Sequence, residues 1–277
     1  MPEPRPAVPA PAATVMIVRD GTDGVEVFML ERNPSADFGG LYVFPGGKLD
    51  EADAASALAA RCHGFGAAEA NRTLGFERDA LAFWVAAIRE CFEEAGILLA
   101  RGPEGDILPL TRPERRERFA GYRKRLNARD AGVFEAMCED ESLTLGTDSL
   151  AYVAHWVTPK VVPRRYDTRF FVARAPADQH AIHDGGEAVE SLWVRPEDAL
   201  ARFRRGELEM ISPTFTNLEA LTGYASADAL LADKRTIDAA TIETIRPAIR
   251  EGTEFEEDFE VIATGGVFDA AAIADGL

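Results

Sequence analysis

Short apolar runs and one long apolar stripe define the elements that the sequence predicts. Runs rich in apolar and β-branched residues, bounded by Gly, Asp and Pro, are typical of strands. They cover residues 13–18, 25–30, 41–44, 97–100, 152–157, 169–173 and 190–194. Helical patterns cover residues 79–95, 111–140, 196–205, 213–222 and 227–233. Strands on both sides of a central helix, followed by closing helices, predict the α/β class: an α/β/α sandwich around a mixed sheet.

The predicted helix 79–95 has two chemically different faces. At about 100° per residue, Glu90, Glu93 and Glu94 fall within an arc of about 100°. The opposite face is apolar and can dock on a core; it contains Leu81, Trp84, Val85, Ile88, Phe92 and Ala95. Gly96 is the residue type that most often ends a helix. The acidic face therefore points into solvent or into a cleft.

Three carboxylates on one face repel one another. Two like charges about 4 Å apart cost about 4 kcal/mol at an effective dielectric constant near 20. Arg89 alone does not offset that repulsion, whereas a hard divalent cation with oxygen ligands would. The alternative is a solvated acidic face, the common outcome for such a pattern.

A glycine-rich turn upstream favours the cleft. The turn Phe44-Pro45-Gly46-Gly47 ends the apolar run 41–44, and a Gly-Gly pair lets backbone carbonyls approach a metal or a phosphate closely. A Phe-Pro-Gly-Gly turn followed by Arg-Glu-x-x-Glu-Glu-x-Gly resembles the signature of the Nudix hydrolases. This resemblance implies a Nudix-type sandwich that cleaves a nucleoside diphosphate linked to another moiety.

The signature is interrupted in this chain. The family places Glu where this chain has Asp53, which leaves the role of Asp53 open. Arg89 lies 42 residues after Gly47, so an insertion of about 28 residues within 54–80 splits the signature, at a loop-closure cost that grows slowly with length. Split signatures resemble one branch of the family, which includes peroxisomal coenzyme A diphosphatases.

The resemblance implies roles for particular residues. Glu90, Glu93 and Glu94, with the carbonyl of Gly47, would hold Mg²⁺, with Mn²⁺ as a substitute. Arg89 would orient the acids. The candidate for the general base, or for an extra metal ligand, is Glu187 in the loop before the run 190–194, with Glu190 in reserve; a solvated loop acid is the alternative reading of Glu187.

Four further residues are predicted to contact substrate. Arg165 and Arg169 flank a Tyr-Asp-Thr turn and could grip a pyrophosphate with two-pronged hydrogen bonds, or pair with surplus acids. Arg32 would touch substrate or pair with Asp37, and Phe44 would line the cleft. The coenzyme A fingerprint of the family is incomplete: Gly40 is kept, but Ala36 stands at its arginine position.

Composition narrows the partners. With 30 Lys and Arg against 47 Asp and Glu, the net charge of −17 argues against a nucleic-acid backbone as partner. The three cysteines have no metal-binding spacing and suit reduced thiols in the cytoplasm. Apolar runs stay well short of the roughly 18 residues that span a membrane. The sequence leaves a homodimer open.

The predicted organisation is one catalytic domain with additions. Residues 1–12 form a disordered Pro- and Ala-rich tail, 13–200 the Nudix domain, and 201–277 a helical extension packed on it. The helical insert 111–140 is rich in arginine, and we favour a solvated helix over a basic substrate platform, because its basic residues are scattered around the helix. The resemblance implies a lid role for it.

The sequence thus predicts a Mg²⁺-dependent hydrolase of the pyrophosphate bond in a nucleoside diphosphate derivative. Coenzyme A or its thioesters, NADH-like dinucleotides and ADP-ribose are the candidate substrates. The alternative is a Nudix-fold sensor that binds a nucleotide without cleaving it.

Overall fold

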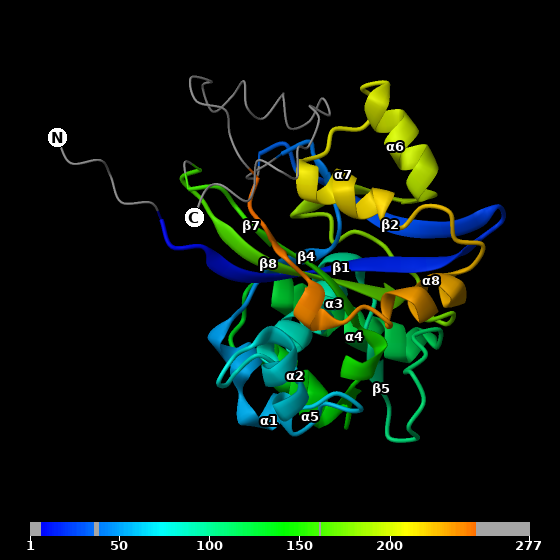
Figure 1. Cartoon of the computed structure of the whole chain (residues 1–277). Coiled ribbons are helices and arrows are strands. Elements are labelled where there is room, and N and C mark those ends of the chain that lie inside the picture. The colour runs from blue at the N-terminus through cyan, green and yellow to red at the C-terminus, as the bar shows by residue number, and fades with distance from the viewer. Residues whose placement is uncertain (1–6, 36–38, 161, 248–277) are drawn as a thin grey trace.

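A mixed sheet separates two layers of helices (Figure 1). The computed structural model describes residues 7–35, 39–160 and 162–247. Within them the sheet has eight strands, with the path β10-β7-β8-β1-β2-β3, and with β4 paired to β1 and β9 to β2. The bounds are β1 Ala10–Gly21, β2 Gly24–Arg32, β3 Tyr42–Val43, β4 Gly46–Lys48, β7 Ala151–Val157, β8 Tyr166–Arg174, β9 Ala188–Val194 and β10 Thr244–Ile245. The predicted α/β/α sandwich is confirmed.

The helices divide between the two faces of the sheet. One face carries α1 (Ser56–Ala59), α2 (Ala67–Leu74), α3 (Ala82–Ala95), α4 (Pro113–Asn127) and α5 (Val133–Asp140), with the small β5–β6 sheet (Ala100–Arg101 and Thr144–Leu145). The other face carries α6 (Pro196–Arg204), α7 (Ser212–Glu219) and α8 (Ala227–Lys234). None of these helices is both long and apolar enough to cross a membrane.

The long strand β1 changes partner along its length, and this opens the sheet. Residues 18–21 of β1 pair with β2, whereas residues 12–14 pair with β4, the Gly-Gly-Lys strand. On its other edge β1 pairs in parallel with β8 over residues 10–18. Because β2 and β4 pair with different stretches of β1, the Gly46–Lys48 strand lies beside the part of β1 that β2 leaves free.

The central helix α3 is stabilised by packing against the rest of the protein on nearly all of its sides. Of its fourteen residues, all except Glu93 are buried. Gly96 ends the helix with a left-handed conformation, φ 70°, as predicted. The predicted start at residue 79 is wrong by one turn, because Asp79 has φ 64°, which a helix cannot contain, and Leu81 is the N-cap.

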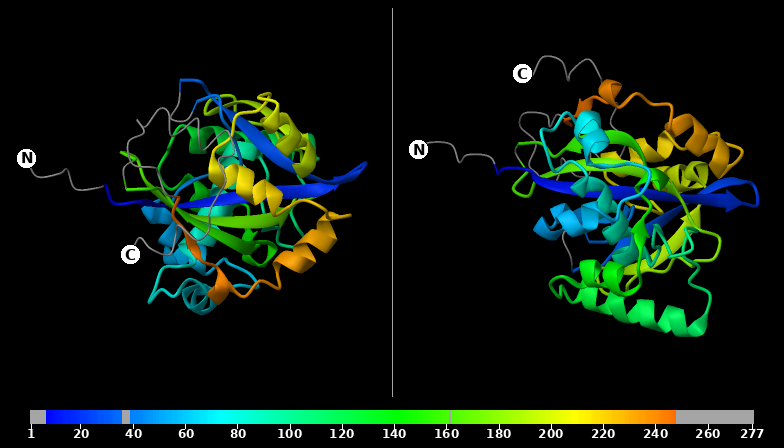
Figure 2. Two further views of the ribbon diagram at one scale, coloured as in Figure 1. Left: turned by 45° about the horizontal axis from the view of Figure 1, so that its top comes forward. Right: turned by 90° about the horizontal axis from the view of Figure 1, so that it is seen from below.

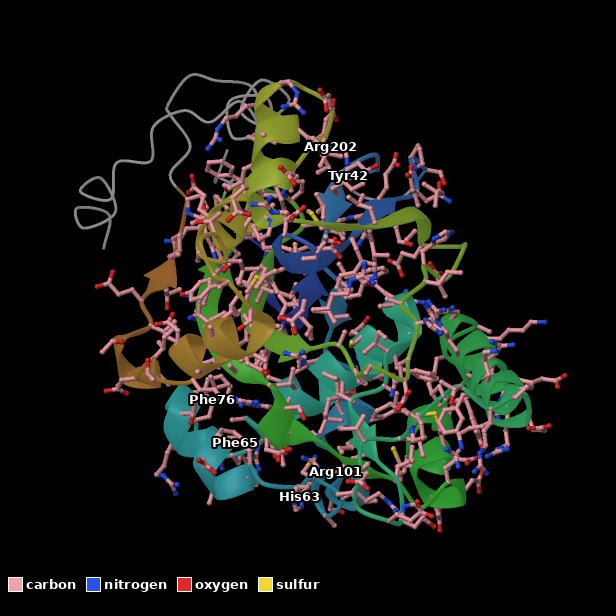
Figure 3. The ribbon with its side chains drawn as sticks, turned by 90° about the vertical axis from the view of Figure 1, so that its right-hand side faces the viewer. Tyr42, His63, Phe65, Phe76, Arg101 and Arg202 are labelled. Atoms are coloured by element: carbon pink, nitrogen blue, oxygen red, sulfur yellow. The ribbon has the colours of Figure 1, made fainter. Side chains whose placement is uncertain are left out.

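The insertion 54–80 is a packed part of the molecule. It forms α1 and α2, and Phe65 between them stacks on Trp84 of α3 with ring centroids 4.6 Å apart. The hydroxyl of Thr147 donates to the carbonyls of His63 and Phe65, both at 2.8 Å. Figure 3 shows His63 and Phe65 at this end of the molecule, near Arg101. These contacts make the insertion a second layer over α3.

The chain ends differ in part from the prediction. Residues 10–12 were assigned to the tail, but they begin β1, because their backbone pairs with Tyr166, Asp167 and Thr168 of β8. At the other end, β10 adds a short parallel strand beside β7. The acidic stretch 254–260 lies outside the described residues. Of the predicted strand 97–100, only Ala100 is in a strand.

Candidate active site

A cavity of about 810 Å³ opens where β1 exchanges β2 for β4. Its floor carries the acidic face of α3 and the Gly46-Gly47 strand. Its walls come from the loop between α4 and α5, the ends of β7 and β8, and the start of α7. The polar and charged lining includes Arg32, Lys48, Asp50, Asp53, Arg89, Glu90, Glu93, Glu94, Arg129 and Glu187. The apolar lining includes Val43, Phe44, Leu58, Leu126, Phe134, Trp156, Val162, Phe170 and Ile211.

Arg89 forms the centre of the floor, and Asp53 is its main partner. The guanidinium group donates from Nε and Nη2 to the two carboxylate oxygens of Asp53, both at 2.8 Å, and both side chains are buried. Nη2 also donates to the Lys48 carbonyl at 2.9 Å. This answers the question that the sequence left open: Asp53 holds Arg89 from the far side of the insertion.

The same guanidinium group reaches the acids of its own helix. Its Nη1 donates to Glu90 at 2.7 Å and to Glu93 at 3.3 Å. Burial works against a charged Arg89, but the hydrogen bond to Asp53 and the charges of Glu90 and Asp53 outweigh it and hold its pKa above the ordinary value. Arg89 therefore stays cationic and orients two acids, the role predicted for it.

The three glutamates carry more negative charge than the protein neutralises. Burial, reinforced by the neighbouring carboxylates, raises the pKa of Glu90 and Glu93 despite the opposing charge of Arg89. Burial and the charge of Glu90 raise the pKa of Glu94 well above its ordinary value. Such shifts mark a site that lacks positive charge when all three acids are ionised.

The glycine turn and the acidic helix meet, although the insertion lies between them in sequence. The Gly46 N–H donates to Glu94 at 2.8 Å. A Cβ atom built on Gly47 would lie 2.6 Å from Glu90 Oε1, so a side chain there would collide with the carboxylate. Gly47 is needed because its backbone lies directly against Glu90. The two halves of the split signature therefore form one site.

The donor set fits a hard divalent cation. Glu90, Glu93 and Glu94 each have one carboxylate oxygen that accepts no hydrogen bond from the described residues. As the side chains lie, no three acidic, histidine or cysteine side chains in the described part of the chain converge on one point. The contacts explain why, since Arg89 and the Gly46 N–H each hold an oxygen aside. The three remaining oxygens and the Gly47 backbone are ligands that Mg²⁺ or Mn²⁺ accepts.

Glu187 lies on an anchored loop at the rim of the cavity. It accepts a hydrogen bond from Arg32 Nη2 at 3.1 Å, and its charge adds to the raised pKa of Glu93 and Glu94. Asp184 accepts from the N–H groups of Glu187 and Ala188, both at 3.0 Å. Glu187 is thus near the acidic helix, where a base or an extra ligand is expected. Arg32 pairs with Glu187; Asp37, its predicted alternative partner, is outside the described residues.

The two arginines near the Tyr-Asp-Thr turn do not line the cavity. Arg165 donates hydrogen bonds to the carbonyls of Ala7, Thr158 and Pro159, so its guanidinium group is bound to the backbone. Arg169 is buried on the α3 side of the sheet, where it pairs with Asp167 and lies 5.1 Å from the centroid of the Phe83 ring at the start of α3. This placement argues against the predicted grip on a pyrophosphate. Phe44 is buried and lines the cavity, as expected.

Sequence analysis missed Arg129 as a lining residue. It lies in the turn between α4 and α5, with a left-handed backbone, φ 58°, followed by Gly132 at φ 73°. Its charge opposes the raised pKa of Glu93, and its guanidinium group makes no hydrogen bond to another described residue. The only signal in the sequence was the basic insert, which was read as a solvated helix. The inward turn that brings Arg129 to the cavity is a tertiary feature.

Known proteins resemble this chain over most of its length. A family model described as the NUDT19 Nudix domain matches residues 9–221. The chain is 30% identical to acyl-coenzyme A diphosphatase NUDT19 of Homo sapiens over 237 residues, covering 74% of this chain and 62% of that protein. It is 30% identical to the protein of the same name from Gallus gallus over 243 residues, covering 74% of this chain and 63% of that protein.

A solved structure shares the fold. The crystal structure of a NUDIX hydrolase from Alicyclobacillus acidocaldarius matches with a TM-score of 0.70 and 28% identity, covering 82% of this chain and 96% of that one. The chain spans less than two thirds of the curated relatives from Homo sapiens and Gallus gallus. The comparisons therefore bear on the domain, and the activity of a whole relative is not transferred by them.

Replacing Asp53 by Asn should destabilise the fold strongly. The buried charge of Arg89 would lose its two-pronged partner, and breaking such a pair costs about 3 kcal/mol or more. Asp50→Asn is the matched control, since Asp50 is 67% exposed and lies 3.9 Å from Arg89; it should cost less than about 1 kcal/mol. Urea unfolding of both variants measures the difference. An equal loss of unfolding free energy in the two variants would show that the Asp53–Arg89 pair stabilises the fold no more than the exposed Asp50 does.

The metal-free protein should lose stability as the pH rises above the ordinary glutamate value of 4.5. The pKa values of Glu90 and Glu94 are higher in the folded protein than in the unfolded chain. At pH values between the two, the folded state binds more protons than the unfolded state. The free energy of unfolding therefore falls as Glu90 and Glu94 ionise in the folded protein. Added Mg²⁺ should reverse the loss, since it binds the ionised acids of the folded state. Urea unfolding in EDTA and in Mg²⁺, from about pH 5 to 7.5, tests this. A flat profile in EDTA would contradict it.

Proposed function

We propose, since the chain belongs to the Nudix hydrolase family, that it hydrolyses the pyrophosphate bond of a nucleoside diphosphate derivative with Mg²⁺ as its cofactor. One observation supports this most directly: three glutamates with unused oxygens lie at the floor of an 810 Å³ cavity, with Glu90 directly against the Gly47 backbone. A pyrophosphate is a compact anion, and its recognition needs cations and backbone groups in this kind of setting.

In this proposal the bound cation neutralises charge on the phosphate oxygens. The protein's own groups do the rest. Arg89 holds Glu90 and Glu93 in place, and the Gly46 N–H holds Glu94. Glu187, kept near them by Arg32, accepts a proton from the attacking water. The water oxygen bonds to one phosphorus, the bridging P–O bond breaks, and two monophosphate esters leave.

The walls of the cavity suggest what lies beyond the pyrophosphate. Several apolar side chains also line the cavity: Val133 and Phe134 at the start of α5, Trp156 and Val162 near the β7–β8 turn, and Ile211 before α7. A substrate with a long, partly apolar arm suits such a wall. The relatives from Homo sapiens and Gallus gallus carry the name acyl-coenzyme A diphosphatase. Among the predicted substrates we therefore favour coenzyme A derivatives over NADH-like dinucleotides and ADP-ribose.

The proposal keeps the cytoplasmic location expected from the sequence. Cys62, Cys91 and Cys138 are free thiols, and burial raises the pKa of Cys62 and Cys138 to about 12. Thiols of this kind persist in a reducing compartment.

Glu94→Gln tests hydrolysis directly. The neutral amide keeps the size of the side chain but removes a predicted ligand, so kcat should fall about 100-fold or more in Mg²⁺. Glu117→Gln, on the exposed side of α4, is the control and should leave kcat unchanged. Chromatography of the two monophosphate products from acyl-coenzyme A, NADH and ADP-ribose measures both. Wild-type protein that binds a nucleotide but cleaves none of them would favour the sensor.

Arg129→Met should weaken substrate binding. Arg129 lines the cavity, and its guanidinium group has no hydrogen-bonding partner in the described chain, so a phosphate oxygen would be its natural acceptor. A charged hydrogen bond contributes about 1.5–3 kcal/mol, so KM should rise about tenfold. The control is Arg116→Met on the exposed face of α4. Steady-state kinetics decides this, and an unchanged KM would remove Arg129 from the binding site.

A further inference from the structure

The carbonyl groups at the C-terminal end of α3 need hydrogen-bond donors from outside the helix. The last four carbonyls of a helix have no partner within the helix. Here the Gly96 N–H bonds to the Phe92 carbonyl at 3.0 Å, which leaves the carbonyls of Glu93, Glu94 and Ala95. Two of these three carbonyls belong to residues that we place in the cation site. Whatever binds them also fixes the backbone from which these carboxylates extend.

One side chain from the helical insert donates to two of these three carbonyls. Arg123 of α4 donates from Nε to the Glu93 carbonyl at 2.9 Å and from Nη2 to the Glu94 carbonyl at 2.7 Å. The third carbonyl, on Ala95, accepts from the Ile182 N–H at 2.9 Å. All the terminal carbonyls of α3 are therefore satisfied, and Arg123 provides two of the bonds.

The same guanidinium group also reaches the segment that leads to Glu187. Its Nη2 donates to the Ile182 carbonyl at 2.7 Å. From Ile182 the chain runs to Asp184, whose side chain holds the Glu187 and Ala188 N–H groups. Arg123 is thus the shared contact between the end of the acidic helix and the loop of the predicted base.

The surroundings of Arg123 are built for this contact. A Cβ atom on Gly96 would lie 3.1 Å from Arg123 Nη1, so the glycine serves both the left-handed turn and the close approach. One turn before Arg123, Phe119 is buried and its ring meets that of Phe92 at 6.1 Å and 83°. Phe119 and Arg123 are four residues apart and so share the face of α4 that contacts α3. The interpretation of this helix as a merely solvated one is therefore wrong for this face.

The charge of Arg123, like its hydrogen bonds, favours its position at the end of α3. The C-terminal end of a helix carries a partial negative charge, and the carboxylates of Glu93 and Glu94 add to it. A cation at this end opposes both. Arg89 acts from the opposite side of the acids, where Asp53 holds it.

We propose that Arg123 is a positioning residue, which fixes the end of α3 and the Glu187 segment relative to each other so that the acids can bind a cation. The inference rests on the proposed function, but its test does not need the reaction. It also assigns a role to the helical insert: α4 is part of the scaffold of the site, fastened to α3 by Phe119 and Arg123. Figure 2 shows α4 along one edge of the molecule, opposite the α2 side.

The test is Mn²⁺ binding measured by electron paramagnetic resonance, without substrate. Arg123→Met removes the three hydrogen bonds and the charge but keeps an unbranched side chain. We expect Mn²⁺ affinity to fall about tenfold, the size typical for losing a group that orients metal ligands. Arg118→Met is the matched control on the same helix, because Arg118 is exposed and pairs with Glu141, the residue after α5; it should bind Mn²⁺ like the wild type.

A second variant keeps the test decisive if Arg123→Met does not fold. Arg123→Lys keeps the charge but donates from one nitrogen and cannot span three carbonyls, so its affinity should lie between those of the wild type and Arg123→Met. Circular dichroism checks that each variant is folded. Wild-type affinity in folded Arg123→Met, or in Arg123→Lys if the first variant is unfolded, would overturn the inference.

The outcomes separate this inference from the proposed function. A wild type that binds Mn²⁺ but cleaves no substrate would defeat the proposed reaction, and the affinities of the Arg123 variants would still decide the positioning role. A wild type that binds no Mn²⁺ would overturn both, since there would be no cation site to position.

Discussion

The buried ion pair between Arg89 and Asp53 is the interaction on which the site depends. Three glutamates on one helical face would repel one another, and Arg89 is the cation that lies among them. An arginine in that position needs a fixed orientation, or it would lean toward whichever acid is nearest. Asp53 supplies it through two parallel hydrogen bonds in a buried setting. Because Asp53 follows the glycine turn, the same pair also draws that turn onto the helix.

This pair explains how a long insertion can interrupt the signature without destroying the site. The insertion leaves the turn just after Asp53 and rejoins the site at α3, so its ends are held together by the ion pair. Between these ends, α1 and α2 pack over the core, with Phe65 stacked on Trp84. The length of the detour is of little consequence, since closure entropy grows only with the logarithm of loop length.

How much of the site could be predicted depends on where its contacts lie in the sequence. The acidic face of α3 was predictable, because helical spacing alone places Glu90, Glu93 and Glu94 together. The meeting of Gly47 with Glu90 was inferred only through a resemblance, since no local rule joins residues 43 positions apart. Asp53 was left open for the same reason.

The arginines show the limit of sequence patterns most clearly. Arg165 and Arg169 had the composition of a phosphate grip, yet the first binds backbone carbonyls and the second is buried against Phe83 of α3. The strand period decides this, since β8 sends alternate residues to opposite faces and Phe170, not Arg169, lines the cavity. Arg123 and Arg129 belong to the helical insert, which has no amphipathic pattern. The packing of α4 on α3 gives Arg123 its partners, and the turn after α4 brings Arg129 to the cavity.

The charge of the whole chain is a poor guide to this cavity. A net charge of −17 would repel a polyanionic substrate at long range, yet Arg32, Lys48, Arg89 and Arg129 all line the space where one would lie. Their placement is uneven: Arg89 and Arg32 are already paired with acids, so they stabilise the site more than they attract a ligand. A bound cation would then change the balance twice, by neutralising the glutamates and by drawing the pyrophosphate toward them. Under the proposed function the cation would therefore control access as well as chemistry, because without it the acidic floor would repel a pyrophosphate.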